Sequence, residues 1–191
     1  MRYYMAPMEG ITNYIFRQAY RLHYREFDRY FTPFLAGEKL TSREKKEIDP
    51  ANNAGMFLVP QILTNQVKVF EGIVNRLLEY GYSVVNLNLG CPSGTVVSKK
   101  RGAGQLQDLQ ALDAFLGEIY DFCDAKSVKL SIKTRIGMKD AAEWPEILKV
   151  YAKYPLEELI VHPRLREEYY GKMIHPDLLS LTKDEAIRCP V

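Results

Sequence analysis

The sequence predicts an α/β protein built as a (β/α) barrel, and three observations support this fold class. Short apolar runs alternate with amphipathic helical segments along the whole chain. Several of these runs are apolar almost without interruption, as expected of parallel strands that are covered on both faces. Polar or reactive residues follow the strands at their C-terminal ends, and in a barrel those ends meet around a single mouth.

The predicted strands and helices follow one another in strict alternation. Strands are expected at residues 3–6, 29–34, 56–61, 84–89, 128–133 and 158–162. Apolar residues recurring every three or four positions predict helices within 67–81, 109–119 and 144–151. Gly81 is the expected stop signal of the first of these helices. Asn65 and Asp140 are the expected N-caps of the first and last.

A doubly wound sheet is the main alternative fold, and the sequence argues against it. Such a fold needs a G-x-G-x-x-G motif after the first strand, and none is present. A complete barrel has eight strands and typically about 250 residues, whereas this chain has 191. Residues 185–191 resemble the approach to a seventh strand. We therefore predict that residues 1–191 form one incomplete barrel domain, a TIM (β/α)8-type barrel truncated to about six β/α units.

Composition excludes several classes of function. The formal net charge is only +2, so any nucleic-acid surface must come from local clustering of charge. Cys91, Cys123 and Cys189 lie far apart, which predicts neither a disulfide framework nor a metal site. There is no apolar run of membrane-spanning length and no secretory signal at the N-terminus. The prediction is a cytoplasmic protein without a membrane or metal partner.

The strongest chemical signal is Cys91, which follows a buried strand on a turn between Gly90 and Pro92. A thiol held there can act as a nucleophile or as a general acid that gives a proton to carbon. Free cysteine is usually buried and inert, so the alternative is a small apolar residue at a strand end.

Further polar residues stand at the ends of the other strands. Lys133 needs either a carboxylate partner, for which Glu9 is one candidate, or an anionic ligand, because burying an unpaired ammonium is costly. His162 ends the last predicted strand. Gln61 and Asn88 carry amides that can pair with a flavin or uracil edge, both of which alternate carbonyl and N–H groups.

A basic segment follows the cysteine turn. Lys99, Lys100 and Arg101 stand before two glycines in a loop that is expected to lie over the mouth. They could meet the phosphates of an RNA substrate. A solvated run of charge is the alternative interpretation.

Together these motifs resemble the tRNA-dihydrouridine synthases. The matching segments are APMEGITN, VPQILTN, NLNLGCPSGTVVSKKRGAG, KTRIG and VHPRLREEYYG, which extend from residue 3 to about residue 171. The cysteine segment with the downstream K-x-R and H-x-R motifs is highly specific for this family. The APM segment alone is not, because other flavin barrels begin in a similar way.

The resemblance implies a flavin cofactor at the barrel mouth. FMN would lie across it, with NADPH or NADH as the diffusible reductant. The implied cofactor-binding residues are Pro7, Met8 and Glu9 beside the ring, Gln61 and Lys133 at its polar edge, and His162 nearby.

The implied reaction reduces specific uridines of tRNA to 5,6-dihydrouridine. Hydride would pass from the reduced flavin to C6 of a flipped-out uracil, and Cys91 would give a proton to C5. Asn88 and Arg135 would bind the uracil or its nucleotide, and Arg164 the flavin phosphate or the RNA. Lys99, Lys100 and Arg101 would contact the tRNA.

The chain departs from the family pattern in two respects. Leu165 and Glu168 stand where the family has threonine and glutamine, from which we expect altered loop contacts and unchanged chemistry. The family's N-G-D strand, its G-R loop for the FMN phosphate and its C-terminal helical tRNA-binding domain are not found.

Two other functions stay open. One is another flavin-barrel oxidoreductase acting on a small pyrimidine or enoate. The other is a truncated, non-catalytic fragment that binds RNA or associates with itself through exposed strand edges.

Overall fold

A row of short parallel strands, covered by helices on one side, forms the centre of the protein. The computed structural model describes residues 1–171, 173–184, 187 and 189–191. Within them the strands are β1 (Tyr4–Met5), β2 (Arg29–Phe31), β3 (Leu58–Val59), β4 (Gln61–Ile62), β5 (Val84–Leu89), β6 (Lys129–Arg135) and β7 (Glu158–His162).

The strands follow the order of the sequence. One sheet has the order β1-β2-β3 and the other β4-β5-β6-β7, and every pairing is parallel. The predicted strand at 56–61 is split at Pro60, which has no N–H to donate to a ladder. Its two halves pair with different neighbours, β3 with β2 and β4 with β5. The chain therefore passes directly from one sheet into the other at this point.

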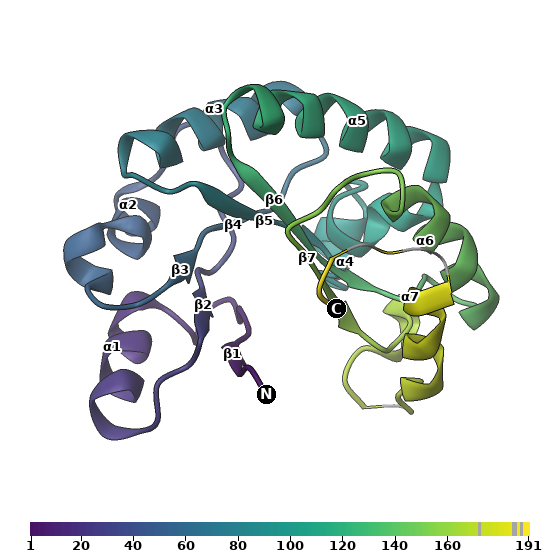
Figure 1. Cartoon of the computed structure of the whole chain (residues 1–191), viewed down its shortest axis with the longest axis horizontal. Helices are drawn as coiled ribbons and strands as arrows, with labels where there is room; N and C mark the ends of the chain where they lie inside the picture. The colour runs from purple at the N-terminus through teal and green to yellow at the C-terminus, as the bar shows by residue number, and fades with distance from the viewer. Residues whose placement is uncertain (172, 185–186, 188) are drawn as a thin grey trace.

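Helices surround this row, and the longer ones cover its outer side. They are α1 (Tyr14–His23), α2 (Ser42–Ile48), α3 (Val67–Glu79), α4 (Gly94–Val97), α5 (Leu109–Ala125), α6 (Trp144–Tyr151) and α7 (Leu181–Asp184). Short 3-10 helices lie at Pro50–Asn53, Gly102–Gln107, Ala141–Glu143, Arg166–Glu168 and Pro176–Ser180. Figure 1 shows an arc with the strands on its inner side and α3 and α5 on its outer side.

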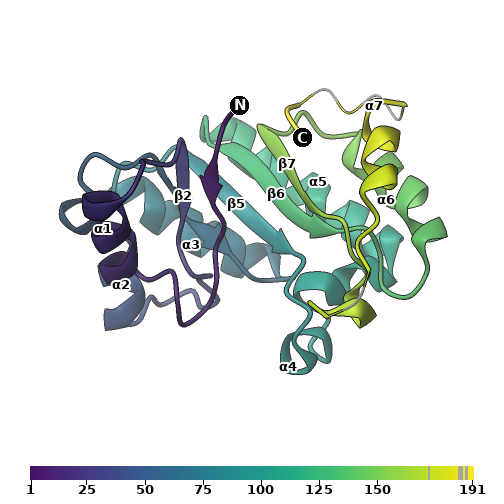
Figure 2. The same ribbon diagram turned by 90° about the horizontal axis from the view of Figure 1, so that it is seen from below.

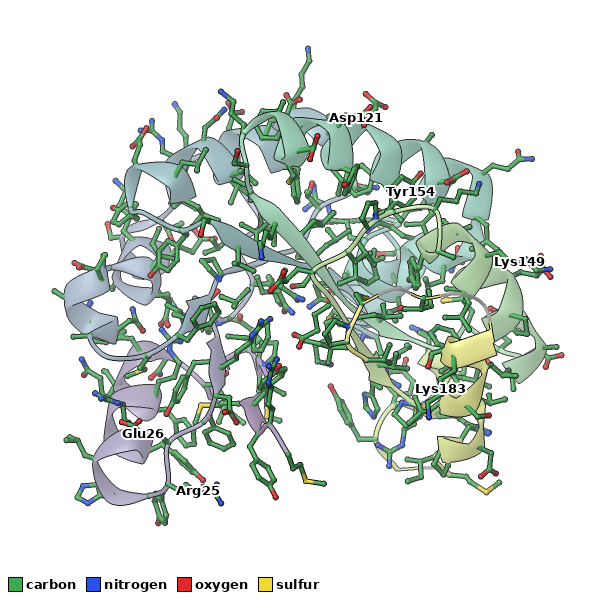
Figure 3. The ribbon with its side chains drawn as sticks, in the orientation of Figure 1. Arg25, Glu26, Asp121, Lys149, Tyr154 and Lys183 are labelled. Atoms are coloured by element: carbon green, nitrogen blue, oxygen red, sulfur yellow. The ribbon has the colours of Figure 1, made fainter. Side chains whose placement is uncertain are left out.

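The main core fills the space between the strands and the outer helices. The apolar stripes of α3, α5 and α6 are buried there. Asp121 and Lys149 lie on the opposite, outward faces of α5 and α6 (Figure 3). The helices thus cover only one side of the strands, and the other side is free to line a cavity.

These findings confirm the α/β class and the parallel pairing, and they correct one expectation, the N-cap at Asn65. The described strands do not close into a barrel, because no pairing joins β1 to β7. Asn65 is not an N-cap: Gln66 precedes α3 without a side-chain cap, and the Asn65 amide donates to the carbonyl of Lys99 at 3.2 Å. Asp140 does cap the short helix that leads into α6, with a capping box to Glu143.

A buried ion pair anchors α1. Arg17 is fully buried, and its Nη1 lies 3.0 Å from Oε2 of Glu47 in α2. The same guanidinium donates to the carbonyl of Thr12 at 2.8 Å and to Oδ1 of Asn53 at 2.8 Å. The Thr12 hydroxyl accepts from the Met8 N–H at 2.8 Å. Arg17 therefore fixes, through Thr12, the loop that follows β1.

A second polar cluster joins the first and last strands at their N-terminal ends. The Tyr4 hydroxyl donates to Oε1 of Glu158 at 2.7 Å, and Arg29 Nη1 lies 3.2 Å from Oε2 of the same carboxylate. Arg29 also pairs with Glu157 at 3.1 Å, as does Lys129. These side-chain bonds connect β1 and β2 to β7, although no backbone hydrogen bonds pair those strands with β7.

The expected approach to a seventh strand lies partly outside the described residues, since 185, 186 and 188 are not among them. The described residues 187 and 189–191 form no strand, although the Leu159 N–H of β7 donates to the carbonyl of Pro190 at 3.0 Å. Among the helices of the described chain, none combines the length and apolar character needed to cross a membrane.

Self-association remains a prediction, and the sheet edge gives it a physical basis. In the described residues β1 pairs with β2 alone, so its other edge is not paired within a sheet. Unpaired strand edges favour pairing between chains. We expect light scattering on the purified protein to detect species larger than a monomer. A monodisperse monomer over a wide concentration range would contradict this.

Candidate active site

A cavity opens at the C-terminal ends of the strands. It encloses about 530 Å³, and small-ligand sites typically enclose about 300–1,000 Å³. Figure 2 shows α4 at the end of the molecule toward which β5 points. The cavity is lined by Ala6, Pro7, Met8, Glu9, Pro33, Phe34, Gln61, Asn88, Gly90, Cys91, Pro92, Lys133, Arg135, Ile160, Val161, His162, Pro163 and Tyr170.

Most of the site residues named from the sequence meet in this cavity. Pro7, Met8 and Glu9 come from the loop after β1, whereas Gln61, Asn88, Lys133, Arg135 and His162 stand on four neighbouring strands. Cys91 and Lys133 share the cavity, and Asn88 is the direct register partner of Lys133. Arg164, Lys99, Lys100 and Arg101 do not line it.

Lys133 lies in the cavity wall without an acidic partner. Among the described residues no carboxylate is within ion-pair distance of it, and the candidate partner Glu9 instead pairs with Arg43 at 3.1 Å. Burial lowers the pKa of Lys133 to about 8, and the neighbouring charge of Arg135 adds to this. A cation in this position is suited to an anionic ligand.

His162 is held as a neutral imidazole. Burial, followed by the charges of Arg135, Lys133 and Arg164, lowers its pKa to about 4. Arg164 Nη1 lies 3.0 Å from His162 Nε2. Because a guanidinium can only donate, Nε2 must accept, and the ring proton of neutral His162 is on Nδ1.

The Cys91 turn is fixed at each of its backbone polar groups. Oδ1 of Asn88 accepts from the N–H of Gly90 at 3.1 Å and from the N–H of Cys91 at 2.5 Å. The carbonyl of Gly90 accepts from Nε of Arg135 at 2.9 Å. The carbonyl of Cys91 accepts from the N–H of Ala103 at 3.1 Å. The backbone from which the Cys91 thiol projects is therefore fixed.

Gly102 makes the close approach to this turn possible. Its φ is +56°, and a Cβ there would lie 2.8 Å from the carbonyl oxygen of Cys91. Any other residue would be strained in its backbone and would collide with the turn.

Arg135 connects the cysteine turn to the loop after β7. The side chain is almost fully buried, and besides Gly90 it donates to the carbonyls of Leu165 at 2.9 Å and Tyr169 at 3.0 Å. Its guanidinium also lies over the Tyr170 ring, 5.4 Å from the centroid. Each nitrogen thus has a backbone partner, and each Nη keeps one further hydrogen for another acceptor.

The basic segment lies in the loop after α4. Lys99 and Lys100 are exposed, and Lys100 has a φ of +51°. Arg101 is half-buried, and its Nε is the buried side-chain polar atom without a hydrogen-bond partner among the described residues. This placement near the Cys91 turn is compatible with both interpretations of the segment.

Leu165 and Glu168, the two residues that differ from the family pattern, form one contact. Glu168 Oε2 accepts from the N–H of Leu165 at 2.6 Å, and Glu168 Oε1 lies 2.8 Å from Nε2 of His175. The loop is therefore closed by its own side chains in a position next to Arg135.

Three polar residues at this site were not predicted from the sequence. Tyr170 lines the cavity, and its ring lies 5.9 Å from that of His162. Asn86 and Ser131 are buried beneath the cavity, and Asn86 bonds to both Gln61 and Ser131. Alternation could have identified the latter two, because they stand two residues before Asn88 and Lys133 and so share their strand faces.

No group of three or more His, Cys, Asp or Glu side chains that could hold a metal ion occurs in the described part of the chain.

Nearly the whole chain is similar in sequence to known proteins of one family. A sequence model for the family described as "Dihydrouridine synthase (Dus)" matches residues 4–180. A Staphylococcus epidermidis protein named "Probable tRNA-dihydrouridine synthase" is 28% identical over 185 residues, which are 94% of this chain and 55% of that protein. The Bacillus subtilis "Probable tRNA-dihydrouridine synthase 2" is 28% identical with the same coverage. The chain spans about half the length of these curated relatives.

Proposed function

Because the chain belongs to the dihydrouridine synthase family, we propose that it carries the catalytic site of an enzyme that reduces specific uridines in tRNA to 5,6-dihydrouridine. One observation supports this above all: Gln61, Cys91 and Lys133, from separate parts of the chain, line one cavity. We also propose that the strand row provides about six β/α units of a TIM-type barrel in the whole protein, and that this protein is cytoplasmic.

The residues around the cavity fit FMN. Lys133 is a partly buried cation without a carboxylate partner among the described residues, suited to the electron-rich edge of a reduced flavin. Gln61 would pair with the polar edge of the ring, neutral His162 would lie beside it, and Pro7, Met8 and Glu9 would border it. The chemistry that FMN supplies when bound is hydride transfer to C6 of uracil, with NADPH or NADH as the diffusible reductant.

The substrate side of the cavity is assigned to Cys91 and its neighbours. The Cys91 thiol would donate a proton to C5 of the uracil, which must be flipped out of the tRNA to reach the cavity. Asn88 and Arg135 each keep one or more amide or guanidinium hydrogens that could bind the uracil. Arg164 would contact flavin phosphate or RNA, and Lys99, Lys100 and Arg101 would contact tRNA phosphates.

Two measurements on the purified protein test this proposal. Added FMN should bind with a change in flavin absorbance, and NADPH should then drive formation of dihydrouridine in tRNA from a synthase-deficient strain. Failure to bind FMN would remove every flavin-based function. Flavin binding without any change in tRNA would instead favour an oxidoreductase acting on a small pyrimidine or enoate.

The affinity for FMN should depend on pH through Lys133. Lys133 is charged below its pKa of about 8 and neutral above it, and the charged form is the stronger partner for the carbonyl edge of the flavin ring. Affinity should therefore be constant well below this pKa and fall as pH rises through it. Between about pH 7 and about pH 9 we expect the dissociation constant, measured by flavin fluorescence, to rise by up to about tenfold.

Lys133→Arg is the matched control, because arginine stays charged across this range. The pH dependence should disappear in that variant. An identical pH dependence in both proteins would show that another group is responsible.

A further inference from the structure

We propose that Asn86 is a positioning residue that sets the orientation of the Gln61 amide and, through Asn88, holds the Cys91 turn. Asn86 does not line the cavity. Its effect on cofactor binding rests on the proposed function, whereas its effect on the turn is a property of the folded chain alone.

Four side chains form one continuous series of hydrogen bonds below the cavity, between a backbone carbonyl at one end and two backbone N–H groups at the other. Ser131 Oγ donates to the carbonyl of Val85 at 3.1 Å, and Asn86 Nδ2 donates to Ser131 Oγ at 2.9 Å. Gln61 Nε2 donates to Asn86 Oδ1 at 2.7 Å, and Asn88 Nδ2 donates to Gln61 Oε1 at 2.8 Å.

The series ends at the cysteine turn, where Oδ1 of Asn88 accepts the N–H groups of Gly90 and Cys91. Its side chains, Ser131, Asn86, Gln61 and Asn88, are all buried. Water therefore cannot easily replace a lost partner, and an unsatisfied amide here is costly.

The groups at the two ends of the series determine which atom is the donor and which the acceptor in every bond. At the turn, backbone N–H groups can only donate, so Asn88 must present its carbonyl oxygen there and its NH₂ to Gln61. At the other end, the Val85 carbonyl can only accept, so Ser131 donates to it and is left to accept from Asn86. Both constraints give Gln61 the same orientation, with its carbonyl toward Asn88 and its NH₂ toward Asn86.

The orientation of the Gln61 amide depends on Asn86. Without its carbonyl, the Gln61 amide has no partner for its NH₂ and is free to rotate by half a turn. A rotated Gln61 would present N–H to the NH₂ of Asn88. Asn88 would then have to lose that bond or rotate away from the backbone of Gly90 and Cys91.

The orientation of Gln61 also determines what the cavity offers to a ligand. Flavin and uracil edges alternate donors and acceptors, so an amide with its two ends exchanged would set donor against donor. Fixing this orientation before the ligand arrives removes the cost of ordering it on binding.

Two substitutions at one position separate orientation from packing. Asn86→Leu keeps the number and branching of the heavy atoms but removes both bonds. Asn86→Asp keeps an acceptor for Gln61 in either protonation state, since the Ser131 hydroxyl can rotate to donate or can accept from a protonated carboxyl. We expect Asn86→Leu to raise the hydrogen-exchange rates of the Gly90 and Cys91 amides by about tenfold or more, and Asn86→Asp to leave them within about threefold of wild type.

Flavin titration of the same proteins gives the second measurement. Asn86→Leu should weaken FMN binding by about tenfold, and Asn86→Asp should restore most of the affinity. If Asn86→Leu does not fold, Ser131→Ala and Ser131→Thr replace the pair: only the alanine variant should show faster exchange at the turn.

Unchanged exchange in Asn86→Leu, or equal damage by leucine and aspartate, would overturn the positioning role. If wild type binds no FMN, the proposed function fails while hydrogen exchange still decides the role of Asn86.

Discussion

Replacing Cys91 with alanine should abolish dihydrouridine formation while the protein keeps its bound flavin and its oxidation of NADPH. Removing a general acid typically lowers the rate by about 10²–10⁴-fold. Flavin binding should survive because the turn is held by the backbone N–H groups and carbonyls of Gly90 and Cys91, not by the thiol. Dihydrouridine is measured by nucleoside mass spectrometry of the treated tRNA.

Cys123→Ala is the control for this experiment. Cys123 is buried in α5 and does not line the cavity. That variant can lose stability through the small void that it creates, but its turnover of tRNA should match wild type. Unchanged turnover in Cys91→Ala would remove Cys91 from its assigned role, and loss of flavin would point to a structural role instead.

Replacing Arg17 with methionine should reduce the free energy of unfolding by about 3–5 kcal/mol, because the change leaves the buried Glu47 carboxylate without its cation. The carbonyl of Thr12 and Oδ1 of Asn53 lose donors at the same time. Urea denaturation, followed by circular dichroism, gives the measurement. FMN affinity should fall as well, since Thr12 holds Met8 at the edge of the cavity.

Two further variants isolate the buried charge as the cause. In Arg76→Met, an exposed pair with Glu79 is lost, and we expect a cost of about 1 kcal/mol or less. The double variant Arg17→Met/Glu47→Leu should recover part of the stability, since it removes the unpaired charge. A cost for Arg17→Met no greater than that for Arg76→Met would contradict this account.

The strands and the location of the cavity could be predicted because they depend on local pattern. Apolar runs such as 84–89 and 158–162 are bounded by polar residues, and parallel strands in sequence order bring their C-terminal ends together. The prediction that Cys91 and Lys133 share one site followed from these two facts, and the cavity confirms that they meet.

What the sequence could not reveal depends on contacts between distant segments. Asn65 has the residue type of an N-cap, but its amide bonds to the carbonyl of Lys99. Arg135 contacts carbonyls of residues 90, 165 and 169, which no spacing rule relates to it. The direction of the Gln61 amide depends on Ser131, seventy positions away in the chain.

The bonds of Tyr4 and Arg29 to Glu158 have a mechanical consequence. They join the outermost strands at their N-terminal ends, which are remote from Cys91. Among the described residues, no such bond is found between the C-terminal ends of the same strands. Any widening of the cavity entrance would thus take the form of a rotation about these joined N-terminal ends, with displacements that grow toward the entrance. The N-terminal ends of the strands would keep their positions while the C-terminal ends move.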